Sequence, residues 1–338
     1  MSSMKNILYV GNALSHKGKT KTSVETLGTF LCEFCNVKTA SNKTNKVLRL
    51  LDMVRLVLKN SRQSDYVLID TYSTSNYYFA LVISQLCRCL NLKYIPILHG
   101  GNLENRLIKN PRYSKLIFKN AYRLISPSQF LEKVFQKYNY DNILYIPNTI
   151  NLNSYSYVER DIDSINLLWV RSFASIYNPE QAVLVLEKLL ELNYDASLTM
   201  IGPDVDGSLA KVKNLEKQKN LKVNFTGKLT KSQWVDVSKD CNIFINTTNF
   251  DNTPVSVIEA MALGLPVVST DVGGMPYLIS DNYDGILVPP KDVSAMTNAI
   301  VQLKTDNVQR VKLVSNARTK VENYSWNVVK HMWVALLS

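Results

Sequence analysis

The side chains with the most chemical content lie in one stretch, residues 249–274. A polar loop there carries Asp251, a proline marks the start of a helix, and Glu259 falls in the first turns of that helix. Free backbone N–H groups at a helix start bind phosphate or sugar oxygens. A carboxylate offers two acceptors to the paired hydroxyls of a ribose. The stretch therefore has the residue types that a phosphate-bearing sugar ligand requires.

The same stretch ends in a turn of two glycines, Gly273 and Gly274, after a buried strand. A purely structural interpretation is also open. Glu259 would then complement the dipole of its helix, and the glycines would only turn the chain. For an isolated glutamate this structural interpretation would be preferred, so the decision depends on the whole string.

As a string, these residues resemble the donor-binding signature of the retaining glycosyltransferases of family 4, the large group 1 family with the GT-B fold. That signature is E-x7-E, followed by A-M-A-x-G-x-P-V-V and later by G-G-x-P. Here the second glutamate is Glu259, and AMALGLPVV and GGMP follow it in register. The first acidic position, eight residues earlier, is Asp251, whose side chain is one methylene shorter than glutamate. Several elements in register make coincidence a poor explanation.

The resemblance implies a role for each matching residue. Glu259 would hold the ribose of a nucleotide-sugar donor, and Asp251 would hold the transferred sugar. We place both in the catalytic set together with His99. The donor-binding set would also include Val257, Ile258, Gly273 and Gly274.

The first half of the chain extends the resemblance. His99 and Gly100 look like the family's His-Gly turn after a first-domain strand, where the histidine approaches the transferred sugar. A strand-end histidine that bonds only locally is an equally good interpretation. Gly11 and Asn12, with Gly18 before the first helix, look like the family's glycine loop on the acceptor side.

The diphosphate of a nucleotide sugar needs cations, and the family pattern supplies them as G-R-x4-K-G. Arg171 occupies the arginine position, but the lysine position falls at Ile176. Lys228, which follows Gly227 at a later turn, is the candidate for the missing charge. A solvated surface lysine is the alternative interpretation of Lys228.

The mechanism that the resemblance implies is sugar transfer with retention at the anomeric carbon, without a metal or any other cofactor. A helix N-terminus and Arg171 would stabilise the departing nucleoside diphosphate. Domain closure would exclude water, and the leaving phosphate would take the acceptor's proton. Asp204 and Asp206 have the spacing of a metal-binding D-x-D motif, but they follow Gly-Pro and are interpreted as part of a turn.

These residues need elements that position them, and the sequence alternates short β-branched runs with amphipathic stretches from end to end. That alternation predicts an α/β fold of parallel sheets with crossover helices. The expected strands are residues 6–10, 66–70, 93–98, 123–125, 142–146, 165–170, 197–201, 222–225, 242–245, 266–269 and 285–288. The expected helices are residues 22–34, 45–59, 77–90, 112–121, 129–138, 179–192, 208–219, 232–239, 255–263, 293–303, 308–321 and 326–336.

We therefore expect two doubly wound Rossmann-like domains that face a central cleft, the GT-B arrangement. The acceptor-side domain would span residues 1–150, and the polar stretch 151–163 would be a linker. The donor domain would span residues 164–322. The last helix, within residues 323–338, would pack back on the first domain.

Composition limits the partners. The chain has 338 residues, 39 Lys and Arg against 28 Asp and Glu, and a net charge of +11. Such an excess suits a phosphate-rich partner, although solvated lysines explain it equally well. No RNP, zinc or aromatic-interleaved basic motif supports nucleic-acid binding. Five cysteines, among them a Cys32–Cys35 pair in a helical pattern, are expected to stay reduced.

Residues 43–62 place six basic side chains among Leu, Val and Met. A basic amphipathic helix can lie on an anionic membrane surface, which suits a lipid-linked acceptor. A core-facing helix with a solvated basic face is the alternative. The sequence has no spanning stretch and no apolar leader near its start, so we expect a cytoplasmic protein, peripheral on the inner membrane face if it binds lipid.

Together these observations favour a hexosyltransferase-type glycosyltransferase that builds a polysaccharide or glycoconjugate on a glycan or lipid-linked acceptor. Two alternatives stay open. One is a non-catalytic subunit that only binds nucleotide sugar, which the aspartate at 251 and the missing lysine would fit. The other is a nucleotide-sugar epimerase of the same fold, which would act on the donor alone. A dinucleotide oxidoreductase is disfavoured because neither half has G-x-G-x-x-G after its first strand.

Overall fold

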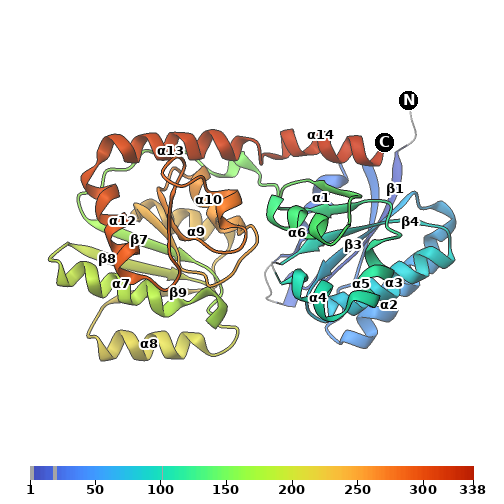
Figure 1. Ribbon diagram of the computed structural model, residues 1–338, viewed down its shortest axis with the longest axis horizontal. Coiled ribbons are helices and arrows are strands. Elements are labelled where there is room, and N and C mark those ends of the chain that lie inside the picture. The colour runs from blue at the N-terminus through green and yellow to red at the C-terminus, as the bar shows by residue number, and fades with distance from the viewer. Residues whose placement is uncertain (1–3, 18–20, 101) are drawn as a thin grey trace. The chain divides into compact units, whose positions relative to one another are not determined.

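A computed structural model describes residues 4–17, 21–100 and 102–338. The chain forms two compact units, shown in Figure 1. Residues 1–149 and 326–338 make up the first unit, and residues 150–325 make up the second unit. Gly18, predicted on the acceptor side, lies outside the described residues.

The first unit is built on a parallel six-stranded sheet in the order β2-β1-β3-β4-β5-β6. Its strands are β1 (Lys5–Val10), β2 (Cys35–Ala40), β3 (Tyr66–Tyr72), β4 (Lys93–His99), β5 (Leu124–Ser126) and β6 (Ile143–Tyr145). Its helices are α1 (Ser23–Leu31), α2 (Lys46–Asn60), α3 (Asn76–Cys89), α4 (Leu103–Lys109), α5 (Pro111–Phe118), α6 (Gln129–Lys137) and α14 (Trp326–Leu337).

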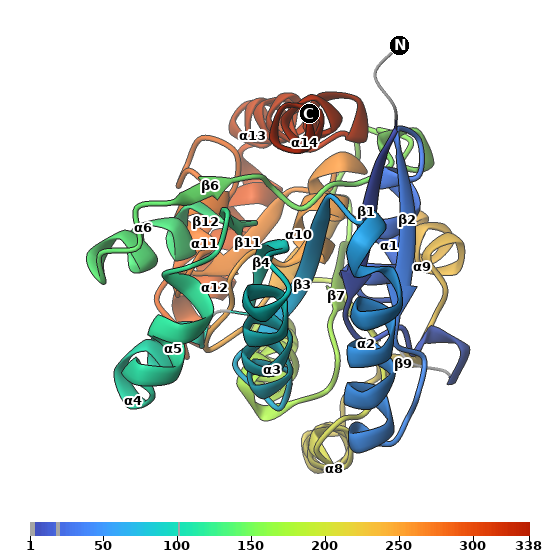
Figure 2. The ribbon, with the colours of Figure 1, turned by 90° about the vertical axis from the view of Figure 1, so that its right-hand side faces the viewer.

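Apolar side chains on both faces of this sheet are buried, as expected for parallel strands with crossover helices. One face packs against α1 and α14, and the other packs against α2 to α6. Figure 2 shows α2 and α3 next to each other on their face. Thr22 and Glu25 form the predicted capping box at the start of α1, where the carboxylate accepts from the Thr22 N–H at 3.2 Å.

The second unit repeats the plan, with a parallel sheet in the order β12-β11-β10-β7-β8-β9. Its strands are β7 (Ile165–Val170), β8 (Ala196–Ile201), β9 (Val223–Gly227), β10 (Ile243–Asn246), β11 (Val267–Thr270) and β12 (Ile286–Val288). Its helices are α7 (Pro179–Glu191), α8 (Ser208–Gln218), α9 (Lys231–Val237), α10 (Val255–Ala262), α11 (Met275–Leu278), α12 (Val293–Thr305) and α13 (Asn307–Glu322). The doubly wound α/β prediction is confirmed for both units.

The strand order places a topological switch point in each sheet, between β1 and β3 in the first unit and between β7 and β10 in the second. At such a point the connections from two neighbouring strands run in opposite directions. The loops after these strands therefore diverge and leave a crevice beyond the carboxyl ends of the strands. Ligands of open α/β sheets bind there. The two switch points are therefore the places to look for function.

The structure differs from the sequence prediction at three elements. The strand β2 was not predicted, and Cys35 begins this strand instead of continuing a helix. Its middle residues are exposed or half-buried, so the strand lacks an apolar alternation that could reveal it. Helices α4 and α11 were also missed, because four to seven residues are too few to show a helical period.

The stretch 151–163, expected as a linker, lies within the second unit. Tyr155 and Ile162 explain this, because both side chains are buried in the cores of that unit. At the other end, the Trp326 ring in α14 stacks on Phe30 of α1, with centroids 4.8 Å apart. The expected cleft between the domains stays a prediction.

Helix α2 has an apolar face that the first unit leaves uncovered. Its inner face is buried through Met53 and Val57. On its outer face, four aliphatic residues each expose between about half and two thirds of their surface. They are Val47, Leu48, Leu51 and Leu58. Among the described residues, no helix combines the length and hydrophobicity that a bilayer-spanning segment needs.

Candidate functional site

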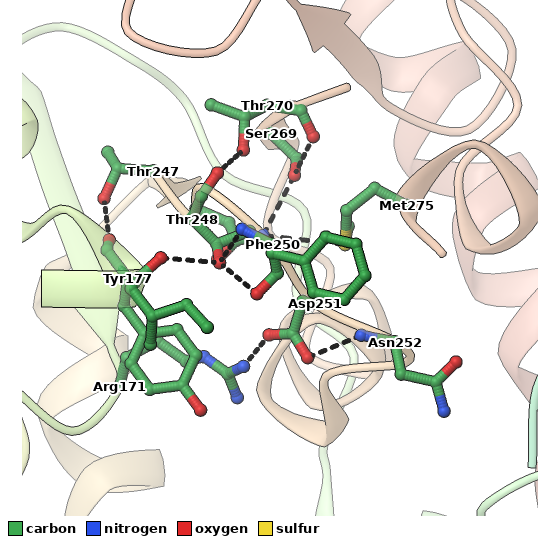
Figure 3. Close-up of polar contacts among 12 residues, drawn as sticks. Arg171, Tyr177, Thr247, Thr248, Phe250, Asp251, Asn252, Ser269, Thr270 and Met275 are labelled. Carbon is green, nitrogen blue, oxygen red and sulfur yellow. Dashed lines mark hydrogen bonds and ion pairs between the residues drawn. The ribbon is translucent and has the colours of Figure 1, made fainter. Parts of the chain in front are cut away.

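The switch point of the second unit brings together two of the predicted residues. Arg171 is the first residue after β7, and Asp251 lies on the loop that follows β10. Their side chains form an ion pair between Nη2 and Oδ2, shown in Figure 3. About one sixth of each side chain is exposed. The fold therefore places a cation and a carboxylate where an open parallel sheet binds its ligand.

The guanidinium of Arg171 lies over the ring of Tyr177, with the central carbon 4.2 Å from the ring centroid. Burial lowers the pKa of Arg171 from its ordinary value. The Nε atom is buried and has no hydrogen-bond partner among the described residues. An arginine presents its donors in a fixed plane that matches phosphate oxygens. Arg171 is thus oriented by Tyr177 and Asp251 and has donor capacity left for an anion.

The loop with Asp251 is fastened to its neighbours on two sides (Figure 3). On one side the Asn249 N–H donates to the carbonyl of Ile176 at 2.8 Å. On the other side the Thr270 hydroxyl donates to the carbonyl of Thr248 at 2.6 Å. The backbone of Ile176 therefore supports this loop, while its side chain, at the family's lysine position, is 46 % exposed.

The glycine pair has a steric reason in this structure. A Cβ atom at Gly273 would overlap the carbonyl oxygen of Asp251, and one at Gly274 would overlap that of Asn252. Gly273 also has a φ of +55°, which side chains disfavour. The Gly274 N–H donates to the Asp251 carbonyl at 2.9 Å. The pair thus holds the backbone of the acidic loop.

Glu259 is buried on α10, with 4 % of its surface exposed. Its Oε1 accepts from the Tyr155 hydroxyl at 2.6 Å and is paired with the ammonium group of Lys231. Burial and the neighbouring carboxylate raise the pKa of Tyr155.

Lys228, the predicted cation, is exposed just after β9. The cation that the structure brings onto Glu259 is Lys231, the first residue of α9.

Val257 and Ile258 face the core, and both side chains are fully buried. Their N–H groups point at the carbonyl of Pro254, at 3.1 and 3.5 Å. In the first turn of α10 the N–H groups outside the helical ladder are therefore those of Val255 and Ser256. The Ser256 hydroxyl is buried and has no hydrogen-bond partner among the described residues. The start of α10 keeps donors for an anion, but two residues earlier than predicted.

Each acidic residue of this site is matched to a cation, Asp251 to Arg171 and Glu259 to Lys231. A phosphate group would compete for the cations, and sugar hydroxyls would donate to the carboxylates. A ligand that carries both groups can replace both ion pairs at once. The arrangement is therefore complementary to a molecule with phosphates next to sugar rings.

Of the predicted acceptor-side residues, Gly11 and Asn12 lie at the switch point of the first unit. Asn12 donates to the Asn76 side chain at 3.2 Å and accepts from Arg49 at 3.0 Å. Arg49 is buried and also donates to the carbonyls of Lys43 and Thr44. It thereby ties the loop after β1 to the loop after β2.

Next to the loops that Arg49 connects is a hollow of about 310 Å³. Its lining is mostly polar and consists of Ala13, Thr39, Ala40, Asn42, Lys43 and Asp52. Carboxylate, amide and hydroxyl groups are the hydrogen-bonding groups that match sugar hydroxyls. The hollow is thus suited in size and chemistry to a small polar ligand.

His99 is the last residue of β4 and is buried, with 7 % of its surface exposed. Its Nε2 lies 2.8 Å from Oδ1 of Asp70 on β3. Gly11, predicted on the acceptor side, packs against the same aspartate.

In the second unit, Asp204 and Asp206 lie where the chain bends, as predicted. Asp206 accepts a hydrogen bond from the Ser175 N–H at 2.9 Å.

Sequence reasoning missed four side chains that contact the predicted ones, namely Tyr177, Lys231, Tyr155 and Asp70. Tyr177 is adjacent to the empty lysine position, so its place in the sequence was a usable signal. Asp70 ends a predicted strand, which is also a usable signal. Lys231 and Tyr155 are far from Glu259 in the sequence, and only the folded second unit brings them together.

Comparison with known proteins agrees with this geometry. Residues 159–320 match the model of the family Glycosyl transferases group 1. An uncharacterized glycosyltransferase of Methanocaldococcus jannaschii is 22 % identical over 243 residues, 70 % of this chain and 66 % of that protein. UDP-Gal:alpha-D-GlcNAc-diphosphoundecaprenol alpha-1,3-galactosyltransferase of Escherichia coli is 25 % identical over 161 residues, 46 % of this chain and 39 % of that protein. This chain thus spans less than two thirds of the length of these relatives.

Solved structures extend the likeness to both units. The structure of Anabaena HepE in complex with UDP has a TM-score of 0.77 and 15 % sequence identity. The match covers 99 % of each chain. The predicted GT-B fold and the resemblance to group 1 glycosyltransferases are therefore confirmed.

Proposed function

Because residues 159–320 match the model of the group 1 glycosyl transferases and the chain has the GT-B fold, we propose that this protein transfers a sugar from a nucleotide-sugar donor to a glycan or lipid-linked acceptor. One observation carries the proposal. The Arg171–Asp251 pair lies at the switch point of the second unit, and the loop with Asp251 runs directly into the helix of Glu259. Phosphate and sugar are the groups to which this arrangement is complementary.

In the donor complex, Arg171 binds the diphosphate, Glu259 the ribose hydroxyls and Asp251 the transferred sugar. Charge grows on the diphosphate as the glycosidic bond breaks, and Arg171 and the start of α10 stabilise that charge. The ribose releases Lys231 from Glu259, and Lys231 then serves as a second cation. These protein cations supply the role of a metal ion, so we propose that transfer needs neither a metal nor another cofactor.

We propose retention of the anomeric configuration and membership of family 4, as the signature residues imply. The anomeric configuration of the product, read by NMR, tests this point once a donor and an acceptor are known. A nucleotide-sugar epimerase would convert the donor alone, so incubation without acceptor separates that activity from transfer.

We further propose that the acceptor is lipid-linked and that the protein acts at the cytoplasmic face of an anionic membrane, in polysaccharide or glycoconjugate synthesis. The exposed face of α2 supports this, because Val47, Leu48, Leu51 and Leu58 are interspersed with Arg55 and Lys59. Such a face suits the boundary between acidic headgroups and acyl chains. The name of the Escherichia coli relative includes a diphosphoundecaprenol acceptor, which is also a membrane lipid.

The hollow beside Asn12 and Arg49 then receives the acceptor. It is lined by Asn42 and Lys43, which lie four and three residues before the start of α2. The headgroup of a lipid whose chains contact α2 therefore has a polar site next to the membrane-facing helix.

Thermal unfolding in the presence of UDP, GDP, ADP and CDP tests the donor site. A nucleotide at about 100 times its Kd adds roughly 2.7 kcal/mol to the stability. One nucleotide should stabilise the wild type and not the Glu259→Gln variant. The matched control is Glu191→Gln, which removes the charge of an exposed glutamate on α7 and should leave the nucleotide effect unchanged. A wild type that no nucleotide stabilises would contradict the proposed function.

A further inference from the structure

A buried carboxylate lies at the switch point of the first unit. Asp70, near the end of β3, is 3 % exposed. Its Oδ1 accepts from the Tyr9 hydroxyl at 2.8 Å and lies 2.8 Å from Nε2 of His99. The three residues come from β1, β3 and β4, and strand alternation places them on the sheet face that α1 and α14 cover. Burial of a carboxylate costs free energy, so its presence here indicates a role in binding the groups around it.

The packing of Asp70 also fixes its direction. The second oxygen, Oδ2, is buried and has no hydrogen-bond partner among the described residues. It lies against Gly11, where a Cβ atom would come within 2.5 Å of it. A glycine after β1 is thus required for the carboxylate to lie flat against the chain. The Tyr9 hydroxyl and His99 Nε2 consequently both contact Oδ1.

His99 is oriented by two contacts. Its ring stacks on Tyr72, with centroids 4.8 Å apart and an angle of 24° between the planes, and its Nε2 is taken by Asp70. The other ring nitrogen, Nδ1, has no hydrogen-bond partner among the described residues. An ionised carboxylate can only accept, so Nε2 carries the proton of the neutral ring and Nδ1 keeps its lone pair.

We propose that Asp70 is the positioning residue for His99. It fixes the tautomer protonated at Nε2 and presents Nδ1 as a hydrogen-bond acceptor at the carboxyl edge of the sheet. An acceptor of this kind binds a hydroxyl group and not an anionic phosphate oxygen, so His99 selects a sugar hydroxyl. The identity of the ligand as a sugar rests on the proposed function, whereas the tautomer does not.

The tautomer is measured by NMR of protein labelled with ¹⁵N-histidine. The chain has three histidines, so a His99→Gln variant assigns the signals. The wild type should show His99 protonated at Nε2, and Asp70→Asn should convert it into a mixture of tautomers or the opposite one. Tyr9→Phe is the matched control, since it removes the other hydrogen bond to Oδ1 and leaves the carboxylate. It should preserve the wild-type tautomer.

A wild-type ring protonated at Nδ1 would overturn the proposal, even if Asp70→Asn fails to fold. An unchanged tautomer in a folded Asp70→Asn variant would overturn it as well. UDP-glucose, with its binding followed by calorimetry, tests the ligand class. Bound UDP-glucose should shift the Nδ1 signal while UDP alone leaves it in place, and bound UDP-glucose without that shift refutes the hydroxyl contact. Failure of every nucleotide and nucleotide sugar to bind would instead count against the proposed function.

Discussion

Replacement of Asp251 by asparagine should make a nucleoside diphosphate bind more tightly. In the unliganded structure, Arg171 is paired with this carboxylate, so a diphosphate must compete with Asp251 for the guanidinium. Asparagine removes the charge but keeps the shape, and its Oδ1 can still accept from the Asn252 N–H, which is 2.8 Å away in the wild type. The variant therefore removes the competitor and leaves the loop in place.

The size of the gain follows from the burial of the pair. The two side chains are 17 % and 14 % exposed, so solvent screens them only partly. Charged groups in contact are coupled by about 0.5–3 kcal/mol. Since 1.4 kcal/mol corresponds to tenfold in affinity, we expect the Kd for the diphosphate to fall by about two- to 140-fold.

The whole donor should behave differently, because Asp251 also binds the transferred sugar. The gain for the nucleotide sugar should be smaller than for the nucleoside diphosphate, and the rate of transfer should fall. Isothermal titration calorimetry with both ligands measures the two affinities. Asp236→Asn, which removes an exposed aspartate of α9, is the control and should change neither. A Kd for the diphosphate that is equal to or weaker than the wild-type value would refute the competition between Asp251 and phosphate.

Three further substitutions test other parts of the structure. Gly274→Ala should destabilise the second unit by about 1–3 kcal/mol in urea unfolding, because the added Cβ overlaps a backbone oxygen; an unchanged midpoint would contradict the close packing of the acidic loop. Tyr155→Phe should cost about 1.5–3 kcal/mol, since the hydroxyl donates to the buried carboxylate of Glu259; a loss below that range would mean that Lys231 alone satisfies the carboxylate. Leu51→Glu should weaken sedimentation with phosphatidylglycerol vesicles by tenfold or more, as expected from a lost leucine burial of roughly 1.5–3 kcal/mol. Val308→Glu in the second unit is its control, and equal loss in both variants would argue against docking through α2.

The sequence was sufficient for most strands of both sheets, because the central strands are buried on both faces and are therefore almost continuously apolar. The strand β7 was predicted to the residue, since it lies in the middle of its sheet. The strand β2 was missed for the opposite reason, because it lies at the edge of its sheet and alternates poorly. A strand that alternates poorly, as β2 does, is thus hidden from a local sequence pattern.

The candidate site divides in a similar way. Arg171 and Asp251 follow predicted strands, so the rule for open sheets was enough to place them at one edge. Lys231 and Tyr155 contact Glu259 across 28 and 104 residues of chain, and no spacing rule connects them. Partners chosen by tertiary packing become visible only in the structure.

The division of the chain has a consequence for its synthesis on the ribosome. The second unit is one uninterrupted stretch, residues 150–325, whereas the first unit includes the closing helix α14. Trp333, Leu336 and Leu337 of that helix are buried in the core of the first unit. The first unit therefore cannot complete its core until α14 has left the ribosome. During that interval the sheet face that α14 later covers remains exposed, and a chaperone that shields apolar surface would find its target there.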